Sequence, residues 1–566
     1  MTKLKLFPLQ TRQPGRRQSP SKEPPTSPAP RRSGPDTSAK MCSAIFLVVA
    51  ALLLASRATG QPITADINVH LQPVIEHIDL VTDINVVGKA MFVCTQPGQL
   101  YRKDLSDNSA AQVFLDLRSQ VGRLGSHIPG LPGLGYPDPE TYDERGLLGF
   151  VADPDFDRNG RFWVWYSAIN ERSASPPGFF QWLVSTTDPW NMAEYDHVDH
   201  LAEYRVVQGV PQLQRTLLKI KRPYFNHTGF QSLTWSPEFN TLLLALGDGG
   251  SEYDPNNIAQ DDAQLSGKLL RINLNQLEGM DFTTTTPVAT FADLKDQRVP
   301  DGAITPLLKG LRNPSKVHHE QIVSPSEDHG RPRSKEGKRH GNGDGNGNGD
   351  GDGHGKGNDN GKGNGDDHDG TDQTVRWIKY LANTGQDTIE YIHGFDKYGI
   401  NFGFRPWEGI FPTSFVTNDS RIIAYGLEAS RLPNSYRPLV EYTHLDPSIG
   451  PNANTGSAIY RGRGISGLQG QLLFTDWISF IPTPQHGLLM HAPVNRDNLQ
   501  EAQPISLFNV DLSGASLQGD DVLFFTSINT NPNGERIFVG GFKKLQYIVN
   551  QRDIPAQAGG VYEVIP

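Results

Sequence analysis

The sequence predicts an all-β fold built from many short strands. Short apolar runs, alternating or continuous, recur along the chain and end at Gly, Pro, Asn or Asp, which is the pattern of strands and turns. The 566 residues include 58 Gly and 42 Pro, a composition that favours turns over long helices. No amphipathic segment of about fifteen residues predicts a long helix. Many strands over roughly 450 residues fit a β-propeller of six four-stranded blades at about 75 residues each, and a pair of β-sandwiches is the alternative.

The clearest strand candidates are spread over the whole predicted domain. Each is rich in β-branched, aromatic or leucine residues and is closed by a turn residue. In chain order they cover residues 90–105, 161–169, 241–250, 456–464, 470–478 and 535–542. Their internal similarity is too weak to set the number of blades.

The first sixty residues predict a leader and a signal peptide. Residues 1–40 are basic and rich in Pro and Ser, and this composition predicts disorder. Residues 41–60 contain an apolar run from Ala44 to Ala55 that ends at small residues, so we expect cleavage near Gly60 and secretion of residues 61–566. Either translation starts at Met41 or residues 1–40 extend the signal; a buried core helix and a membrane anchor are the alternatives.

One internal segment departs from the strand pattern. Residues 326–372 are dominated by Gly, Asn and Asp and cannot bury apolar surface, so we expect a disordered insertion into a hairpin of one blade. The segment lacks the nine-residue period of a calcium-binding β-roll. A solvated spacer is the interpretation, and weak cation binding is the alternative.

The net charge gives no indication of a nucleic-acid partner, and the cysteine content excludes an internal disulfide in the mature chain. The net charge of −10 is modest for this length and gives no reason to expect nucleic acid. The two cysteines are Cys42, inside the predicted signal, and Cys94, so the mature chain would have no internal disulfide. We expect a monomer or a weak dimer.

Two stretches carry a family resemblance. Residues 226–273 read NHTGF, then a strand, a GDGG turn and GKLLRIN, and LRNP follows at 311–314. Residues 144–168 add ERGLLGFVADPDFDRNGRFWVWYSA. This order resembles the glucose/sorbosone dehydrogenase family, whose members are six-bladed β-propellers that bind pyrroloquinoline quinone (PQQ) and calcium. The resemblance covers roughly residues 70–566 and implies oxidation of an aldose or a related polyol by hydride transfer.

The resemblance assigns chemical roles to four residues. His227 matches the general base that takes a proton from the sugar hydroxyl, a task suited to imidazole. Arg312 and Asn313 match the pair that binds the quinone oxygens, where a guanidinium stabilises developing charge. Glu144 falls at the pocket rim, where cofactor-binding members tend to have glutamine. A structural histidine and a turn-capping Arg-Asn pair are the alternatives.

Two calcium sites are predicted. The resemblance places a calcium on the backbone carbonyls of Gly385 and Gln386, and such oxygens suit a hard cation. The loop from Asp248 to Asp262, with Asp248 and Asp254, is a candidate for a second site. A solvated polar loop is the alternative for this second site.

Asn226 and Asn418 each begin an N-glycosylation sequon. A glycan on Asn226 would crowd any cofactor beside His227. The family usually has an acidic residue at this place, so Asn226 also removes a carboxylate that could orient the imidazole.

Three positions depart from the resemblance. PQQ is a tricarboxylate and needs cations, yet Ile478 stands where the family has a lysine, and Asp520 and Asp521 stand where it has arginines. Lys543 and Lys544 are candidate replacements. The departures predict weak PQQ binding. They leave open a second function: a non-enzymatic secreted propeller that binds a protein or carbohydrate, similar in type to the hedgehog-interacting proteins.

Overall fold

The computed structural model describes residues 63–121, 144–176, 190–251, 253–325, 373–386, 388–413, 436–444, 446, 449–450, 453–478, 486–519, 521–545 and 557–566. These residues belong to one compact unit, Pro62–Pro566. The predicted leader 1–40, signal 41–60 and insertion 326–372 lie outside the described residues. Among the described residues, no helix is long and apolar enough to cross a membrane.

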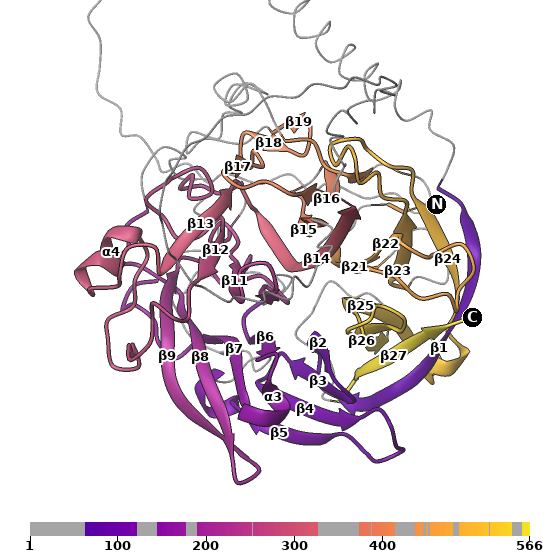
Figure 1. Cartoon of the computed structure of the whole chain (residues 1–566), viewed down its shortest axis with the longest axis horizontal. Helices are drawn as coiled ribbons and strands as arrows, with labels where there is room; N and C mark the ends of the chain where they lie inside the picture. Colours follow the sequence, from indigo (N-terminus) through magenta and orange to yellow (C-terminus); the bar gives the residue numbers. More distant parts are fainter. Residues whose placement is uncertain are drawn as a thin grey trace, which may run out of the picture. The chain divides into compact units, whose positions relative to one another are not determined.

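The described residues form a β-propeller of four-stranded blades, as the strand pattern predicts (Figure 1). Three sheets are separate and have four strands each. The first contains β2 (Val81–Val87), β3 (Ala90–Thr95), β4 (Gln99–Asp104) and β5 (Gln112–Asp116), and the second contains β6 (Leu147–Ala152), β7 (Arg161–Ala168), β8 (His197–Val207) and β9 (Val210–Arg222). The third contains β14 (Asn313–Pro325), β15 (Gln373–Thr384), β16 (Ile389–Phe395) and β20 (Val440–Thr443). A fourth sheet contains β10 (Leu233–Ser236), β11 (Thr241–Ala245), β12 (Lys268–Ile272) and β13 (Ile304–Lys309), extended by the two-residue β17 (Ile400–Asn401). Four separate blades are fewer than the six that the sequence predicts.

The remaining large sheet has eight strands in the order β21-β22-β23-β24-β1-β27-β26-β25. Its members are β21 (Asn454–Ile459), β22 (Leu472–Asp476), β23 (Leu488–Ala492), β24 (Ser506–Asp511), β1 (Ala65–Ile78), β27 (Gly559–Ile565), β26 (Ile537–Leu545) and β25 (Asp521–Thr530). All neighbours are antiparallel except β24 and β1, which run parallel. The first described strand therefore pairs with the last, a connection that joins the two ends of the domain.

Helical structure is minor. The described helices are α2 (Arg118–Val121), α3 (Phe156–Asn159), α4 (Phe291–Asp296) and the 3-10 turn η2 (Ser513–Ala515), and a short ribbon pairs β18 (Trp407–Glu408) with β19 (Phe411–Pro412). Of these helices, α4 is the longest with six residues, in agreement with the absence of a long helical pattern in the sequence.

The core lies between neighbouring blades. Strand β11 is the run TLLLA, in which every side chain is buried, because both faces of its sheet are covered. Trp163 of β7 stacks on Trp235 of β10, with ring centroids 5.7 Å apart. Leucine and aromatic side chains of two blades thus share one packed layer, which fixes the loops at the ends of their strands.

Strands β14 and β15 pair up to Pro325 opposite Gln373. The residues before and after 326–372 are therefore antiparallel neighbours in one blade.

Candidate functional site

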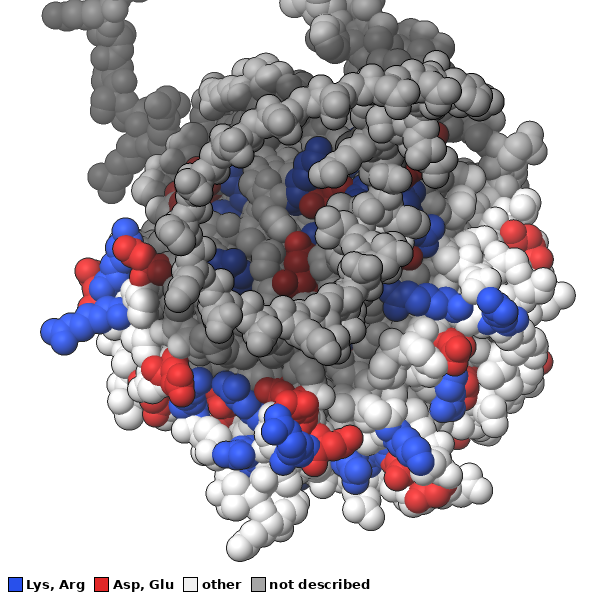
Figure 2. Space-filling model, in the orientation of Figure 1, with Lys and Arg blue, Asp and Glu red and all other residues white. Residues whose placement is uncertain are grey.

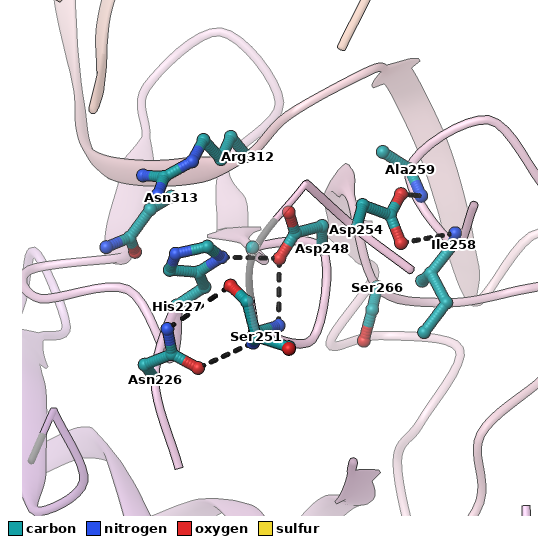
Figure 3. Close-up of polar contacts among 12 residues, drawn as sticks. Asn226, His227, Asp248, Ser251, Asp254, Ile258, Ala259, Ser266, Arg312 and Asn313 are labelled. Atoms are coloured by element: carbon teal, nitrogen blue, oxygen red, sulfur yellow. Dashed lines mark hydrogen bonds and ion pairs between the residues drawn. The ribbon is translucent and has the colours of Figure 1, made fainter. Parts of the chain in front are cut away.

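His227 lies in the loop between β9 and β10 and is 2% exposed. Its backbone has φ +55°, a conformation that L residues adopt only when the surroundings enforce it. Its backbone N–H donates to Glu144 Oε2 at 2.7 Å, and its Nδ1 lies 2.7 Å from Asp248 Oδ1 (Figure 3). When Asp248 is ionised, Nδ1 carries the proton and Nε2 is the basic nitrogen.

Asp248 follows β11 in the GDGG turn. Gly249 (φ +106°) and Gly250 (φ +99°) allow the chain to reverse here, so that the Gly250 N–H also donates to Asp248 Oδ1 at 2.8 Å. The Asp248 side chain is buried, and burial raises its pKa to about 7 against the opposing charge of Arg312. Its second oxygen, Oδ2, is buried without a hydrogen-bond partner among the described residues. Asp248 supplies the carboxylate that orients the imidazole. The family resemblance gives this role to an acidic residue at position 226, where this chain has Asn226.

Arg312 and Asn313 lie where β14 begins. Both backbone N–H groups donate to Asn383 Oδ1, at 3.2 and 3.0 Å, which holds this strand end against β15. The Arg312 guanidinium donates through Nε to Gln386 Oε1 at 3.0 Å and through Nη1 to the Thr384 carbonyl at 3.2 Å. Figure 3 shows the Arg312 and Asn313 side chains beside the His227 ring.

Glu144 connects these segments. Its Oε2 accepts from the His227 backbone N–H and from Asn313 Nδ2, the latter at 3.0 Å, and its own carbonyl accepts from Thr228 Oγ1 at 2.6 Å. Burial raises the pKa of Glu144, while His227 and Arg312 lower it. Glu144, His227, Asp248, Arg312 and Asn313 therefore form one hydrogen-bonded cluster, contributed by four separate parts of the sequence.

The predicted calcium turn lies next to this cluster. Gly385 N–H donates to Glu390 Oε2 at 3.1 Å and Gln386 N–H to Glu408 Oε1 at 2.9 Å. Gln386 also accepts from Arg312 through its side chain. The turn is therefore connected to the cluster, and its donors are taken by two carboxylates.

The second predicted cation site has a different arrangement. Both oxygens of Asp254 accept backbone N–H groups, from Ile258 and Ala259 at 2.8 Å each (Figure 3). Burial, and then the charge of Asp248, raises the pKa of Asp254 to about 7. The described residues contain no group of three or more His, Cys, Asp or Glu side chains suited to a metal. Asp254, which is 1% exposed, holds the buried part of the loop in shape, while Asp261 and Asp262 at its end are exposed.

The two glycosylation predictions remain predictions. Asn418 lies outside the described residues. The Asn226 side chain is 8% exposed and exchanges hydrogen bonds with the backbone of Ser251, at 2.7 and 3.4 Å (Figure 3). A glycan on that nitrogen would have to displace the loop, which argues against modification at Asn226.

Charged side chains are mixed by sign on the surface. On the face drawn in Figure 2, basic and acidic side chains of the described residues alternate around the lower rim. This face shows no extended patch of one sign in its described part.

Comparison with known proteins gives distant matches. No family model matches the chain. Hedgehog-interacting protein of Mus musculus, like that of Homo sapiens, is 26% identical over 138 residues, which is 24% of this chain and 17% of that protein. HIPL1 protein of Arabidopsis thaliana is 23% identical over 414 residues, 68% of this chain and 49% of that protein.

The chain resembles soluble sugar dehydrogenases and hedgehog-interacting proteins. Among solved structures, the PQQ-bound aldose sugar dehydrogenase of Streptomyces coelicolor covers 89% of this chain and 99% of its own, with a TM-score of 0.46 and 13% identity. The apo-form aldose sugar dehydrogenase of Escherichia coli covers 88% and 100%, with a TM-score of 0.45 and 14% identity. The chain spans about half or less of the length of the curated proteins it matches.

The donor groups of the cluster are of the kind that a quinone oxygen accepts from. Arg312 and Asn313 can donate to quinone oxygens beside the His227–Asp248 pair. At the positions that the resemblance gives to cations, Ile478 is buried against Phe524 and Phe542, and Lys543 is paired with Glu76 at 2.8 Å.

The remaining positions are Asp520 and Asp521, and the remaining candidate lysine is Lys544. None of them provides a basic side chain among the described residues. Asp521 begins β25, and Asp520 and the Lys544 side chain lie outside the described residues. At these positions the described residues provide no unpaired cation for a carboxylate of a cofactor.

Proposed function

We propose that this chain is a secreted sugar dehydrogenase-like protein that oxidises a hydroxyl of an aldose or related polyol. The proposal is carried by one observation: His227 is paired with a buried Asp248 and lies beside Arg312 and Asn313 in one cluster. These are the groups that the family resemblance assigns to proton removal and to cofactor binding.

The chemistry follows from the cluster. His227 Nε2 removes the hydroxyl proton, because Asp248 keeps the other ring nitrogen protonated and stabilises the imidazolium that forms. Arg312 and Asn313 would hold the quinone oxygens, and calcium on the Gly385 and Gln386 carbonyls would bind at the adjacent turn. PQQ, when bound, supplies the hydride acceptor. Since Ile478 cannot pair with a carboxylate, we expect PQQ to bind weakly.

The test uses the purified secreted protein. PQQ and calcium are titrated while quinone absorbance and aldose-dependent dye reduction are followed. Wild type should show saturable turnover, and His227→Gln should lose about two to four orders of magnitude in kcat while cofactor absorbance still changes. His491→Gln is the matched control, because its imidazole also pairs with an aspartate, Asp66 at 2.8 Å, in a different sheet. Equal turnover in wild type and His227→Gln would exclude His227 as the base, and no turnover in either at saturating PQQ would exclude the dehydrogenase.

A second function is favoured by a separate observation. Ile478 forms an apolar cluster with Leu80, Phe524 and Phe542 where a cofactor-binding cation is expected. A propeller that has lost cofactor binding could retain a surface for a protein ligand, as the name of the hedgehog-interacting proteins states for them. Direct binding of purified hedgehog protein, measured with and without calcium, tests this alternative if PQQ fails to bind.

We also infer that the propeller has six blades. The eight-stranded sheet supports this number, because it divides at the parallel β24–β1 pair into two sets of four antiparallel strands. Added to the four separate blades, the two sets make six. An experimental structure in which this sheet is a single continuous blade would contradict the inference.

Secretion is proposed from the predicted signal peptide. N-terminal sequencing of protein from the culture medium should begin near Gln61, and recovery only inside cells with Met1 present would contradict it.

A further inference from the structure

A row of buried charged side chains lies behind the His227 loop. Arg145 Nη1 is 3.0 Å from Asp196 Oδ1, and the two nitrogens of His197 lie 2.9 Å from Asp196 Oδ1 and 3.2 Å from Asp199 Oδ1. Arg222 Nε lies 3.3 Å from Asp199 Oδ2. All five side chains are buried, and none takes part in the chemistry proposed above.

The row ends on the backbone of the candidate site. Arg222 Nη2 donates to the His227 carbonyl at 2.6 Å, and both its terminal nitrogens lie 3.4 Å from the carbonyl of Gly247, the residue before Asp248. Its Nη1 also donates to Ser266 Oγ at 2.6 Å. One guanidinium thus binds the two backbone segments that carry the base and its carboxylate. Only a planar group with several donors can do this at once.

Arg145, at the other end of the row, is next in sequence to a residue of the same cluster. Arg145 is the residue after Glu144, whose carboxylate accepts the His227 backbone N–H. His197 lies between two carboxylates, with Nδ1 2.9 Å from Asp196 Oδ1 and Nε2 3.2 Å from Asp199 Oδ1, and although burial lowers the pKa of the ring, these neighbours raise it above its ordinary value. Asp199 in turn lies 3.3 Å from Arg222 Nε, so the row connects Glu144's neighbour to Arg222 through contacts between oppositely charged groups.

We propose that Arg222 is the positioning residue of the site: it holds the His227 and Asp248 backbones at the separation that allows their hydrogen bond. His227 has a positive φ, and an added Cβ on Gly247 would lie 2.2 Å from the His227 carbonyl, so the two backbone segments that Arg222 binds are in close contact. The inference rests on the proposed function for its catalytic meaning, but the positioning itself exists without substrate or cofactor.

The test is proton NMR of the full secreted chain without cofactor. A low-field Nδ1–H resonance from the His227–Asp248 hydrogen bond should be present in wild type and is assigned by its loss in His227→Gln. In Arg222→Lys, which keeps the charge but not the fork, this resonance should shift or disappear. If the dehydrogenase is active, kcat should fall about a hundredfold, because a displacement of about 1 Å at a catalytic group has that effect.

Arg215→Lys is the matched control. Arg215 lies on the same strand β9, is paired with Glu203 at 2.9 Å and also donates to backbone carbonyls, of Leu277 and Met280. The Arg215→Lys variant should have a lower thermal midpoint than wild type, but its His227 resonance should be unchanged. Asp199→Asn, a milder change, should shift the resonance in the same direction as Arg222→Lys.

An unchanged resonance in both Arg222→Lys and Asp199→Asn would overturn the positioning role. Because the resonance is read without turnover, an inactive wild type would count against the dehydrogenase proposal and leave the positioning result intact.

Discussion

At the scale of single residues, the candidate site depends on one hydrogen bond. His227 and Asp248 come from opposite sides of the β10–β11 hairpin and meet at 2.7 Å in a buried setting. Burial strengthens the interaction between them, since few waters screen it. It also raises the pKa of Asp248 to about 7, so this carboxyl changes its charge close to neutral pH.

Asp248→Asn tests the pair. The amide keeps the shape but loses the charge that fixes the imidazole tautomer, so kcat should fall by about two to four orders of magnitude. In wild type, kcat should rise with pH through about 7 as Asp248 loses its proton. This rise should be absent in Asp248→Asn. A variant that retains both the rate and the pH step would show that Asp248 does not act on His227.

Buried carboxylates also set the pH dependence of stability. Burial raises the pKa of Asp248, Asp254 and Asp476 to about 7 each, above the ordinary value near 4 in an unfolded chain. The folded state therefore binds these protons more tightly. Their contribution to stability is fully present below about pH 4 and is lost as pH rises through about 7.

The thermal midpoint should accordingly fall between pH 5 and pH 8. Asp476→Asn should flatten the fall, because its amide cannot ionise while its oxygen can still accept from the Ala453 N–H and its NH2 group can donate to the Tyr442 hydroxyl oxygen. Calorimetry of both proteins over this range is the measurement, and identical slopes would contradict the assignment for Asp476.

At the scale of elements, most of the donors in the turn after β15 are held by one carboxylate oxygen. Glu408 Oε1 accepts from the backbone N–H groups of Gln386, Thr388 and Ile389 at 2.9, 2.8 and 2.9 Å. A glycine is required at the start of the turn, because a Cβ on Gly385 would lie 1.7 Å from the Ile389 carbonyl. With its N–H groups held, the turn presents its carbonyls in one arrangement.

Glu408→Gln should loosen this turn. Loss of a charged acceptor of three N–H groups should lower the free energy of unfolding by about 1–3 kcal/mol. Calcium affinity, measured by calorimetric titration, should fall as well if the Gly385 and Gln386 carbonyls bind the ion. Glu501→Gln on the surface is the control and should change neither quantity. Unaltered calcium binding in Glu408→Gln would place the ion elsewhere.

At the scale of the whole domain, the propeller is closed by pairing of its two chain ends. Strand β1 lies between β24 and β27, and its Val69, Leu71 and Ile75 are buried. A chain that begins at Pro62 keeps β1 and should unfold cooperatively. A chain that begins at Leu80 lacks β1, so it leaves β24 and β27 with unpaired edges and should not fold. Circular dichroism melts of both chains are the measurement, and a cooperative melt of the shorter chain would contradict this closure.

Much of the fold could be predicted from the chain because strand signals are local. Runs such as residues 161–169 and 241–250 carry their own apolar pattern and turn residues, and they became β7 and β11 with the loops that follow. The pairing of β1 with β24 and β27 left no such signal. It joins residues more than four hundred positions apart, and no local pattern records a partner at that distance.

The same division holds for the site. The motif order by itself pointed to His227, Arg312, Asn313 and Glu144, because a family resemblance is written in residue types and spacing. Two features were decided only by tertiary structure. Asp248 is the carboxylate that orients the imidazole, and Arg222 binds the backbone segments of His227 and Asp248. Hydrogen bonds between loops of different strands depend on how whole sheets pack, and a buried aspartate or arginine looks in the sequence like any polar residue in a turn or strand.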